Sequence, residues 1–253
     1  MQLKKQIPNI ITLLNLFCGC IATIFAVQGA LELAALFVAL GIGFDFFDGF
    51  AARILNVQSE LGLQLDSLAD MVTSGLVPGI VMFQMLAKTS GTSVSTVFNS
   101  WDFNQNSAQV FIPYLSLIGL LITLASAYRL AKFNIDTRQT TSFIGLPTPA
   151  NALLILSLPL ILQFQTEAWI SDIILNQWFL IGLTLVSCYL LNAEIPLFAL
   201  KFKTWGLAEN KMRYIFLLLT ILLLIILKFL AIPCVILLYV IMSMVFKEKT
   251  VGG

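Results

Sequence analysis

Long apolar stretches separated by short polar intervals run along the whole chain. Eight of them approach the ~20 residues that a helix needs to cross a bilayer. They cover residues 8–28, 33–55, 62–87, 110–132, 147–165, 171–192, 212–228 and 230–246. This pattern predicts an all-α integral membrane protein with about eight transmembrane helices, the last two forming a tight hairpin.

The remaining segments show no internal repeat and no second domain. We therefore expect a single polytopic membrane domain over residues 1–253, with a six-helix core at about 7–192 and a C-terminal part at about 193–246. Within that part, residues 195–205 mix large apolar side chains with lysines. This segment is either an interfacial helix or a basic cytosolic connector. No role is assigned to the polar interval 88–109.

Basic residues are distributed unequally between the two sides of this topology. With eight spans and an internal N-terminus, twelve lysines and arginines fall on one side, and only Lys88 and Lys228 on the other. Because positively charged loops stay in the cytosol, the distribution predicts an even number of spans and two cytosolic termini.

Composition narrows the class of protein further. Of 253 residues, 59% are hydrophobic and 11% charged, and the mean hydropathy is +0.95. An average soluble domain has roughly 25% charged residues, so ordinary globular and disordered proteins are excluded. The net charge of +1 gives no basic surface for nucleic acid. The absence of histidine excludes imidazole metal ligands and histidine bases.

Four aspartates concentrate the acidic charge near the second polar interval. Asp45 and Asp48 are three residues apart, and Asp66 and Asp70 four apart, so each pair lies on one helix face. The first pair ends one span and the second pair opens the next. An antiparallel helix hairpin therefore brings all four carboxylates together near the cytosolic boundary.

Carboxylates this close repel one another unless cations neutralise them. Charged groups at membrane depth tend to mark functional sites. With oxygen ligands only, a hard divalent ion, Mg²⁺ or Mn²⁺, is the natural occupant. Two such ions balance four carboxylates and suit phosphoryl transfer. The alternative is a set of solvated helix-end carboxylates, stabilised by the helix dipole.

The same residues form the longer pattern Asp45-x2-Asp48-Gly49-x2-Ala52-Arg53-x8-Gly62-x3-Asp66-x3-Asp70. At all eight defined positions the chain resembles the CDP-alcohol phosphotransferase family. The resemblance implies a metal-dependent membrane enzyme that displaces CMP from a CDP-linked lipid or alcohol. It implies that the four aspartates hold two divalent cations and that Asp70 is also the base for the acceptor hydroxyl.

The resemblance also assigns a CDP pocket, lined by Gly49, Ala52, Arg53 and Gly62. Two polar residues at the start of the first span, Asn9 and Thr12, lie near the same membrane face, and we predict that they bind CDP as well. For Asn9 the alternative is an N-cap, since it precedes an apolar run.

Two further stretches, 128–134 and 143–150, resemble the integral-membrane phosphatidylserine synthases within that family. This implies CDP-diacylglycerol and L-serine as substrates and an acceptor or phosphate site at Arg129, Lys132 and Asn134. That group has arginine where Lys132 stands, and lysine keeps the charge but loses the bidentate geometry. For Arg129 and Lys132 the alternative is that they serve topology alone.

The resemblance further implies a homodimer. The predicted topology places the active site at the cytosolic face of the cell membrane. Several alternatives stay open. The acceptor could be glycerol 3-phosphate or inositol phosphate, and the donor an archaeal-type ether lipid. A cation transporter would need acidic groups at the bilayer midplane and a broken-helix repeat, and the sequence shows neither. A purely structural membrane protein leaves the eight-position pattern unexplained.

Overall fold

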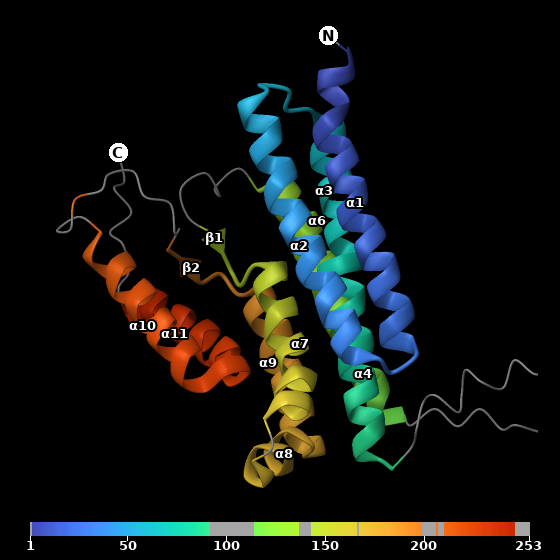
Figure 1. The fold of residues 1–253 in the computed structure, drawn as a ribbon, viewed down its shortest axis with the longest axis vertical. Coiled ribbons are helices and arrows are strands. Elements are labelled where there is room, and N and C mark those ends of the chain that lie inside the picture. Colours follow the sequence, from blue (N-terminus) through green and yellow to red (C-terminus); the bar gives the residue numbers. More distant parts are fainter. Residues whose placement is uncertain are drawn as a thin grey trace, which may run out of the picture.

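The computed structural model describes residues 2–91, 114–136, 143–165, 167–198, 206 and 210–245. Almost all of this part is helical, which confirms the all-α prediction (Figure 1). The elements are α1 (Gln2–Val27), α2 (Leu31–Ile54), α3 (Glu60–Asp70), the π-helix η1 (Met71–Leu76), α4 (Val77–Thr89), the 3₁₀-helix η3 (Tyr114–Leu120), α6 (Leu121–Ile135), β1 (Phe143–Ile144), α7 (Thr148–Phe164), α8 (Ala168–Ile174), α9 (Gln177–Asn192), β2 (Pro196–Leu197), α10 (Lys211–Leu227), the 3₁₀-helix η4 (Lys228–Leu230) and α11 (Ala231–Val245).

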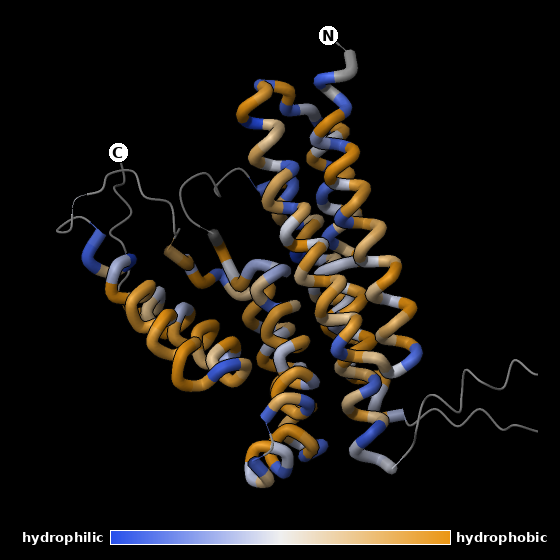
Figure 2. Tube along the Cα trace, viewed as in Figure 1, coloured by the Kyte–Doolittle hydropathy of each residue, from blue (hydrophilic) through white to orange (hydrophobic). Residues whose placement is uncertain are grey.

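Five helical stretches in the described residues are long and apolar enough to cross a membrane: Gln6–Val27, Leu31–Ile54, Glu60–Thr89, Tyr114–Ile135 and Lys211–Val245. The bent pair α8–α9 would make a sixth. Figure 2 shows hydrophobic residues along most of the helix surfaces and hydrophilic ones gathered toward helix ends. These features are typical of a multi-pass membrane protein. The count of eight spans and the cytosolic termini stay predictions.

The sixth and the last two predicted spans differ in how well they match the structure. The axes of α8 and α9 are bent by 61°, so the single span expected at 171–192 is broken. The cause is Asn176, whose side chain accepts hydrogen bonds from the backbone N–H groups of Trp178 and Phe179 and starts a new helix. The expected C-terminal hairpin is confirmed: α10 ends before Lys228, and α11 packs back against it.

Helix α1, helix α2 and the continuous stretch α3–η1–α4 pack side by side (Figure 1), and the four aspartates lie on α2 and α3. Glycines allow the closest approach. A side chain at Gly19 or Gly41 would collide with Thr73 of η1, as expected where small residues bring membrane helices together. An apolar core of residues from α1, α2, α4, η3–α6, α7, α8 and α9 fills the half of the bundle that is remote from the acidic residues.

A two-stranded antiparallel ladder connects two distant loops. Phe143 pairs with Leu197 and Ile144 with Pro196, which joins the segment after α6 to the segment after α9. The described part of the possible interfacial helix, Ile195–Phe198, is therefore extended and not helical. Its remainder, 199–205, and residues 92–109 of the polar interval lie outside the described residues.

Candidate active site

The predicted helix hairpin brings the aspartates of α2 and α3 together. Asp45, Asp48 and Asp66 each place one carboxylate oxygen within 4.8 Å of the others. Asp70, one turn further along α3, lies outside this trio but near enough to Asp45 and Asp66 for their charges to interact. The structure thus gathers the four predicted ligands as a trio with a fourth carboxylate beside it.

No lysine or arginine in the part of the chain that the structure describes forms an ion pair with these carboxylates. Asp48 and Asp70 are only 6% and 8% exposed. The single ion pair among the described residues joins Lys132 to Glu194 and involves none of the four aspartates. Buried charge without a partner is costly, and an all-oxygen donor set fits Mg²⁺ or Mn²⁺. The cluster could therefore hold a divalent cation.

Helix α1 supplies hydrogen-bond donors to two of the acids. The Thr12 hydroxyl lies 2.6 Å from Asp48 Oδ2 and donates to it. The Asn15 amide nitrogen lies 3.3 Å from Asp70 Oδ1. The sequence analysis missed Asn15, although a signal was present. It follows Thr12 by three residues and so lies on the same helix face, inside an otherwise apolar span.

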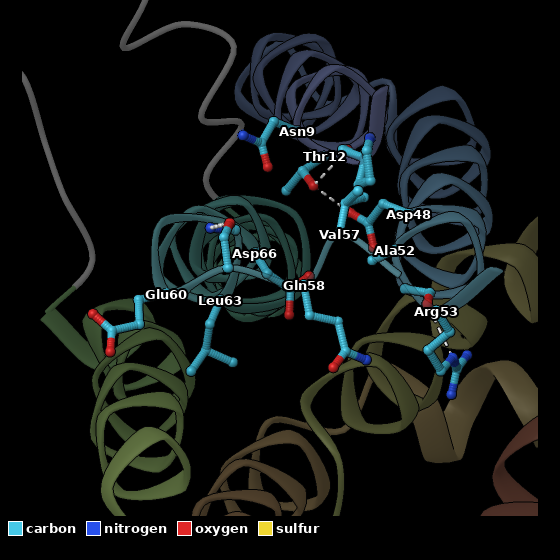
Figure 3. Close-up of a pocket in the computed structure, with 14 residues that line it drawn as sticks. Asn9, Thr12, Asp48, Ala52, Arg53, Val57, Gln58, Glu60, Leu63 and Asp66 are labelled. Atoms are coloured by element: carbon cyan, nitrogen blue, oxygen red, sulfur yellow. Dashed lines mark hydrogen bonds between the residues drawn. The ribbon is translucent and has the colours of Figure 1, made fainter. Parts of the chain in front are cut away.

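A pocket of about 600 Å³ opens beside the cluster, between α1, α2, α3 and the turn that joins α2 to α3. Figure 3 shows Asn9 and Thr12 entering from α1, Asp48 and Arg53 from α2, and Asp66 from α3. All six residues predicted to bind CDP line this pocket: Asn9, Thr12, Gly49, Ala52, Arg53 and Gly62. Its size is typical of a small-molecule site, and two of the predicted metal ligands form part of its wall.

Local structure keeps this pocket open. Ser59 caps α3, its hydroxyl accepting a hydrogen bond of 3.1 Å from the Gly62 N–H. A Cβ at Gly62 would lie 3.2 Å from Ser59 Oγ and 3.3 Å from Asn9 Oδ1, so any side chain there would crowd the pocket. Asn9 is not an N-cap, because α1 begins at Gln2 and Asn9 lies inside the helix.

The predicted acceptor residues on α6 lie elsewhere. Arg129, 7% exposed, donates to the carbonyl oxygens of Ile144 at 2.7 Å and Leu191 at 3.2 Å. Lys132 forms an ion pair of 3.3 Å with Glu194. Both basic residues line a space of only about 10 Å³ beside the end of α9. The structure does not bring them into the large pocket.

Asn134, the third predicted acceptor residue, faces α3 instead. Its amide nitrogen lies 2.9 Å from the hydroxyl of Ser67, which is adjacent to Asp66. This contact links α6 to the helix that carries two of the acids. Acceptor binding by Arg129, Lys132 and Asn134 stays a prediction.

The fold and the site together define an all-helical membrane protein with an acidic cluster in the wall of a ligand-sized pocket. The family model for CDP-alcohol phosphatidyltransferases matches residues 5–188, which include this whole site. The chain belongs to that family.

Several curated relatives share about 30% identity with the chain. A CDP-diacylglycerol–serine O-phosphatidyltransferase of Bacillus subtilis is 32% identical over 57% of this chain and 70% of its own length. The Mycobacterium tuberculosis protein of the same name is 30% identical over 68% of this chain and 55% of its own. An archaetidylserine synthase of Methanothermobacter thermautotrophicus is 28% identical over 60% and 56%. The chain thus spans little more than half the length of the last two.

Proposed function

We propose that the protein transfers a phosphatidyl group from CDP-diacylglycerol to L-serine, giving phosphatidylserine and CMP. The observation that carries this proposal is a pocket lined by six of the eight residues of the family pattern, among them Asp48 and Asp66, with Asp45 beside them. The names of the relatives in Bacillus and Mycobacterium support serine as the acceptor.

The donor would lie with its acyl chains in the bilayer and its CDP group in the pocket. Asp45, Asp48, Asp66 and Asp70 would hold two divalent cations, which supply electrostatic stabilisation of charge on the diphosphate. The lack of side chains at Gly49 and Gly62 leaves room for the nucleotide. Arg53, exposed and tethered by its Nε to the Gly49 carbonyl at 3.0 Å, carries the positive charge on that side.

In the reaction, the serine hydroxyl oxygen bonds to the phosphorus that carries diacylglycerol, and the bond from that phosphorus to the CMP oxygen breaks. Asp70 accepts the hydroxyl proton, and Arg53 stabilises the departing CMP. A serine hydroxyl is a weak nucleophile at neutral pH, so a positioned base is needed. Asp70 is suited to this role because it is buried and lies beside the trio of acids.

The pocket favours an acceptor without a phosphate group. Glycerol 3-phosphate or inositol phosphate would bring a second anionic group, which calls for added basic side chains. Among the described residues that line the pocket, Arg53 is the single basic one. The proposal also places the site at the cytosolic face of the cell membrane, because basic residues concentrate on that side of the predicted topology.

The proposal is tested by CMP release from the purified protein in detergent, with Mn²⁺ or Mg²⁺ and a panel of acceptors. Parallel reactions use CDP-diacylglycerol and its ether-linked archaeal counterpart. Release that requires both L-serine and metal would support the proposal. Release with glycerol 3-phosphate or inositol phosphate would overturn the acceptor, and no release with any pair would overturn the enzyme assignment.

A further inference from the structure

Two polar residues on one face of α1 each contact an acid from a different helix. Thr12 bonds Asp48 of α2, and Asn15 bonds Asp70 of α3. The two donors are three residues apart, one helical turn. One short stretch of α1 thus contacts both helices of the acidic hairpin.

Asn15 is fully buried, with 0% of its surface exposed. Its backbone carbonyl accepts a hydrogen bond of 3.2 Å from Thr73, within the π-helix that starts directly after Asp70. π-helical turns are frequent at functional sites. The backbone of α1 and the segment that follows Asp70 are therefore tied together at the point where the amide meets the carboxylate.

Only the nitrogen of the Asn15 side-chain amide forms a hydrogen bond among the described residues. Its nitrogen donates to Asp70, whereas its oxygen has no hydrogen-bond partner among the described residues and lies toward Gly41. Leaving a buried polar atom without a partner is costly, and a leucine of similar volume would avoid that cost. A packing role alone does not account for an amide here, but a role as donor to Asp70 does.

We propose that Asn15 is a positioning residue that fixes the Asp70 carboxylate by holding Oδ1 and leaving Oδ2 for the acidic cluster. It is the counterpart of Thr12 at Asp48. The part of this inference that concerns turnover rests on the proposed function, and the part that concerns cation binding does not.

The chain offers a matched control at the other end of the same helix pair. Gln84 of α4 is also nearly buried, and its amide nitrogen donates to the carbonyl oxygens of Ala26 and Val27 at 3.1 Å and 2.9 Å. Replacing Gln84 by leucine removes an amide contact between α1 and the α3–α4 stretch without touching an acid. It therefore reports what loss of such a contact does to stability alone.

The experiment compares wild type, Asn15→Leu, Asn15→Ser and Gln84→Leu, each as the full chain purified in detergent. Mn²⁺ affinity is measured from the electron paramagnetic resonance signal of free Mn²⁺, and thermal unfolding is followed in EDTA. We expect both Asn15 variants to bind Mn²⁺ about 10- to 100-fold more weakly. We expect Gln84→Leu to lower the unfolding temperature but to keep the wild-type affinity for Mn²⁺. If Asn15→Leu does not fold, the Mn²⁺ affinity of Asn15→Ser is compared with wild type instead.

Turnover gives a second reading. We expect kcat of the Asn15 variants to fall about 10- to 100-fold, while KM for CDP-diacylglycerol stays near the wild-type value, as for a group that acts on the reacting centre. Wild-type Mn²⁺ affinity in both Asn15 variants, or an equal loss in Gln84→Leu, would overturn the inference, as would a wild-type protein that binds no Mn²⁺. If wild type binds Mn²⁺ but releases no CMP, the proposed function fails while the Mn²⁺ comparison still decides the role of Asn15.

Discussion

The stretch α3–η1–α4 and the hairpin α10–α11 are both long and apolar, yet they are used in opposite ways. In Glu60–Thr89, 61% of the most apolar 18 residues are buried inside the protein, against 11% in Lys211–Val245. The first stretch exchanges side-chain hydrogen bonds with α1 and α6, through residues such as Asn15 and Ser67. In Figure 1 the hairpin lies to one side of the bundle, against α7 and β2.

The difference shows where this chain uses polar groups inside the membrane. Buried carboxylates and amides are costly in a bilayer. Among the described residues, the aspartates of the site and the amide that contacts one of them lie where α1, α2 and α3 meet. The hairpin has few such groups in its described part and packs on the bundle through apolar side chains of α11. Hydrogen bonds add to this packing. Gln165 contacts its turn, and the Tyr239 hydroxyl donates to the Phe198 carbonyl at 2.8 Å. The candidate site therefore lies in the bundle, and the hairpin leaves most of its apolar surface uncovered by the rest of the described chain.

The largest expected effect comes from the acids of the bundle. Asp66→Asn or Asp70→Asn should lower serine-dependent CMP release by on the order of 10³-fold or more, because each removes several kcal/mol of electrostatic or base catalysis. The folded protein should remain, as judged by thermal unfolding in detergent. Asp172→Asn, an exposed acid on α8, is the control and should keep wild-type activity. Normal turnover in either site variant would contradict the assignment.

Spacing along the sequence was enough to locate the acidic site. Because helical periodicity fixes which residues share a face, the four aspartates could be grouped before any coordinates, whereas most of the pocket residues were assigned by the resemblance to the family. The contacts of Arg129 and Lys132 could not be predicted in this way. A basic residue at a helix end has the same sequence pattern whether it binds a ligand or a neighbouring group of the protein. The angle within α8–α9 and the π-helix after Asp70 depend on side-chain hydrogen bonds and packing, which hydropathy does not report.

The second expected effect concerns the turn between β1 and α7, which lies against the end of α9. Gly145 has φ +75°, and a Cβ there would lie 2.8 Å from the Leu191 oxygen and 2.9 Å from the Ala193 oxygen. Gly145→Ala should therefore cost about 2–4 kcal/mol, from left-handed strain plus overpacking. Gly29 has φ +80° with nothing within 4 Å of such a Cβ. Gly29→Ala should cost only about 1–2 kcal/mol. Equal losses of stability in the two variants, measured by thermal unfolding, would contradict the close contact between Gly145 and the end of α9.

A smaller effect is expected where the hairpin meets α7. Gln165 donates to the Leu227 carbonyl at 3.2 Å and accepts from the Leu230 N–H at 3.0 Å, across the turn between α10 and α11. Gln165→Leu should cost about 1 kcal/mol, in the range of polar contacts within membrane proteins. Hydrogen exchange should then quicken in residues 211–245 and stay unchanged in residues 2–91. A fall in CMP release of more than about twofold would show that the hairpin is coupled to the chemistry.

The smallest effect separates two roles for Lys132. Its ion pair with Glu194 is exposed, with the side chains 32% and 67% accessible, so breaking it should cost at most about 0.5 kcal/mol. Lys132→Ala and Glu194→Ala should therefore unfold at nearly the same temperature as wild type. If Lys132 serves only the α6–α9 contact, where the pair lies outside the large pocket, KM for serine should also stay unchanged in both variants. A rise in KM for serine in Lys132→Ala alone would show that this lysine binds the acceptor carboxylate, which would extend the active site from the bundle toward α9.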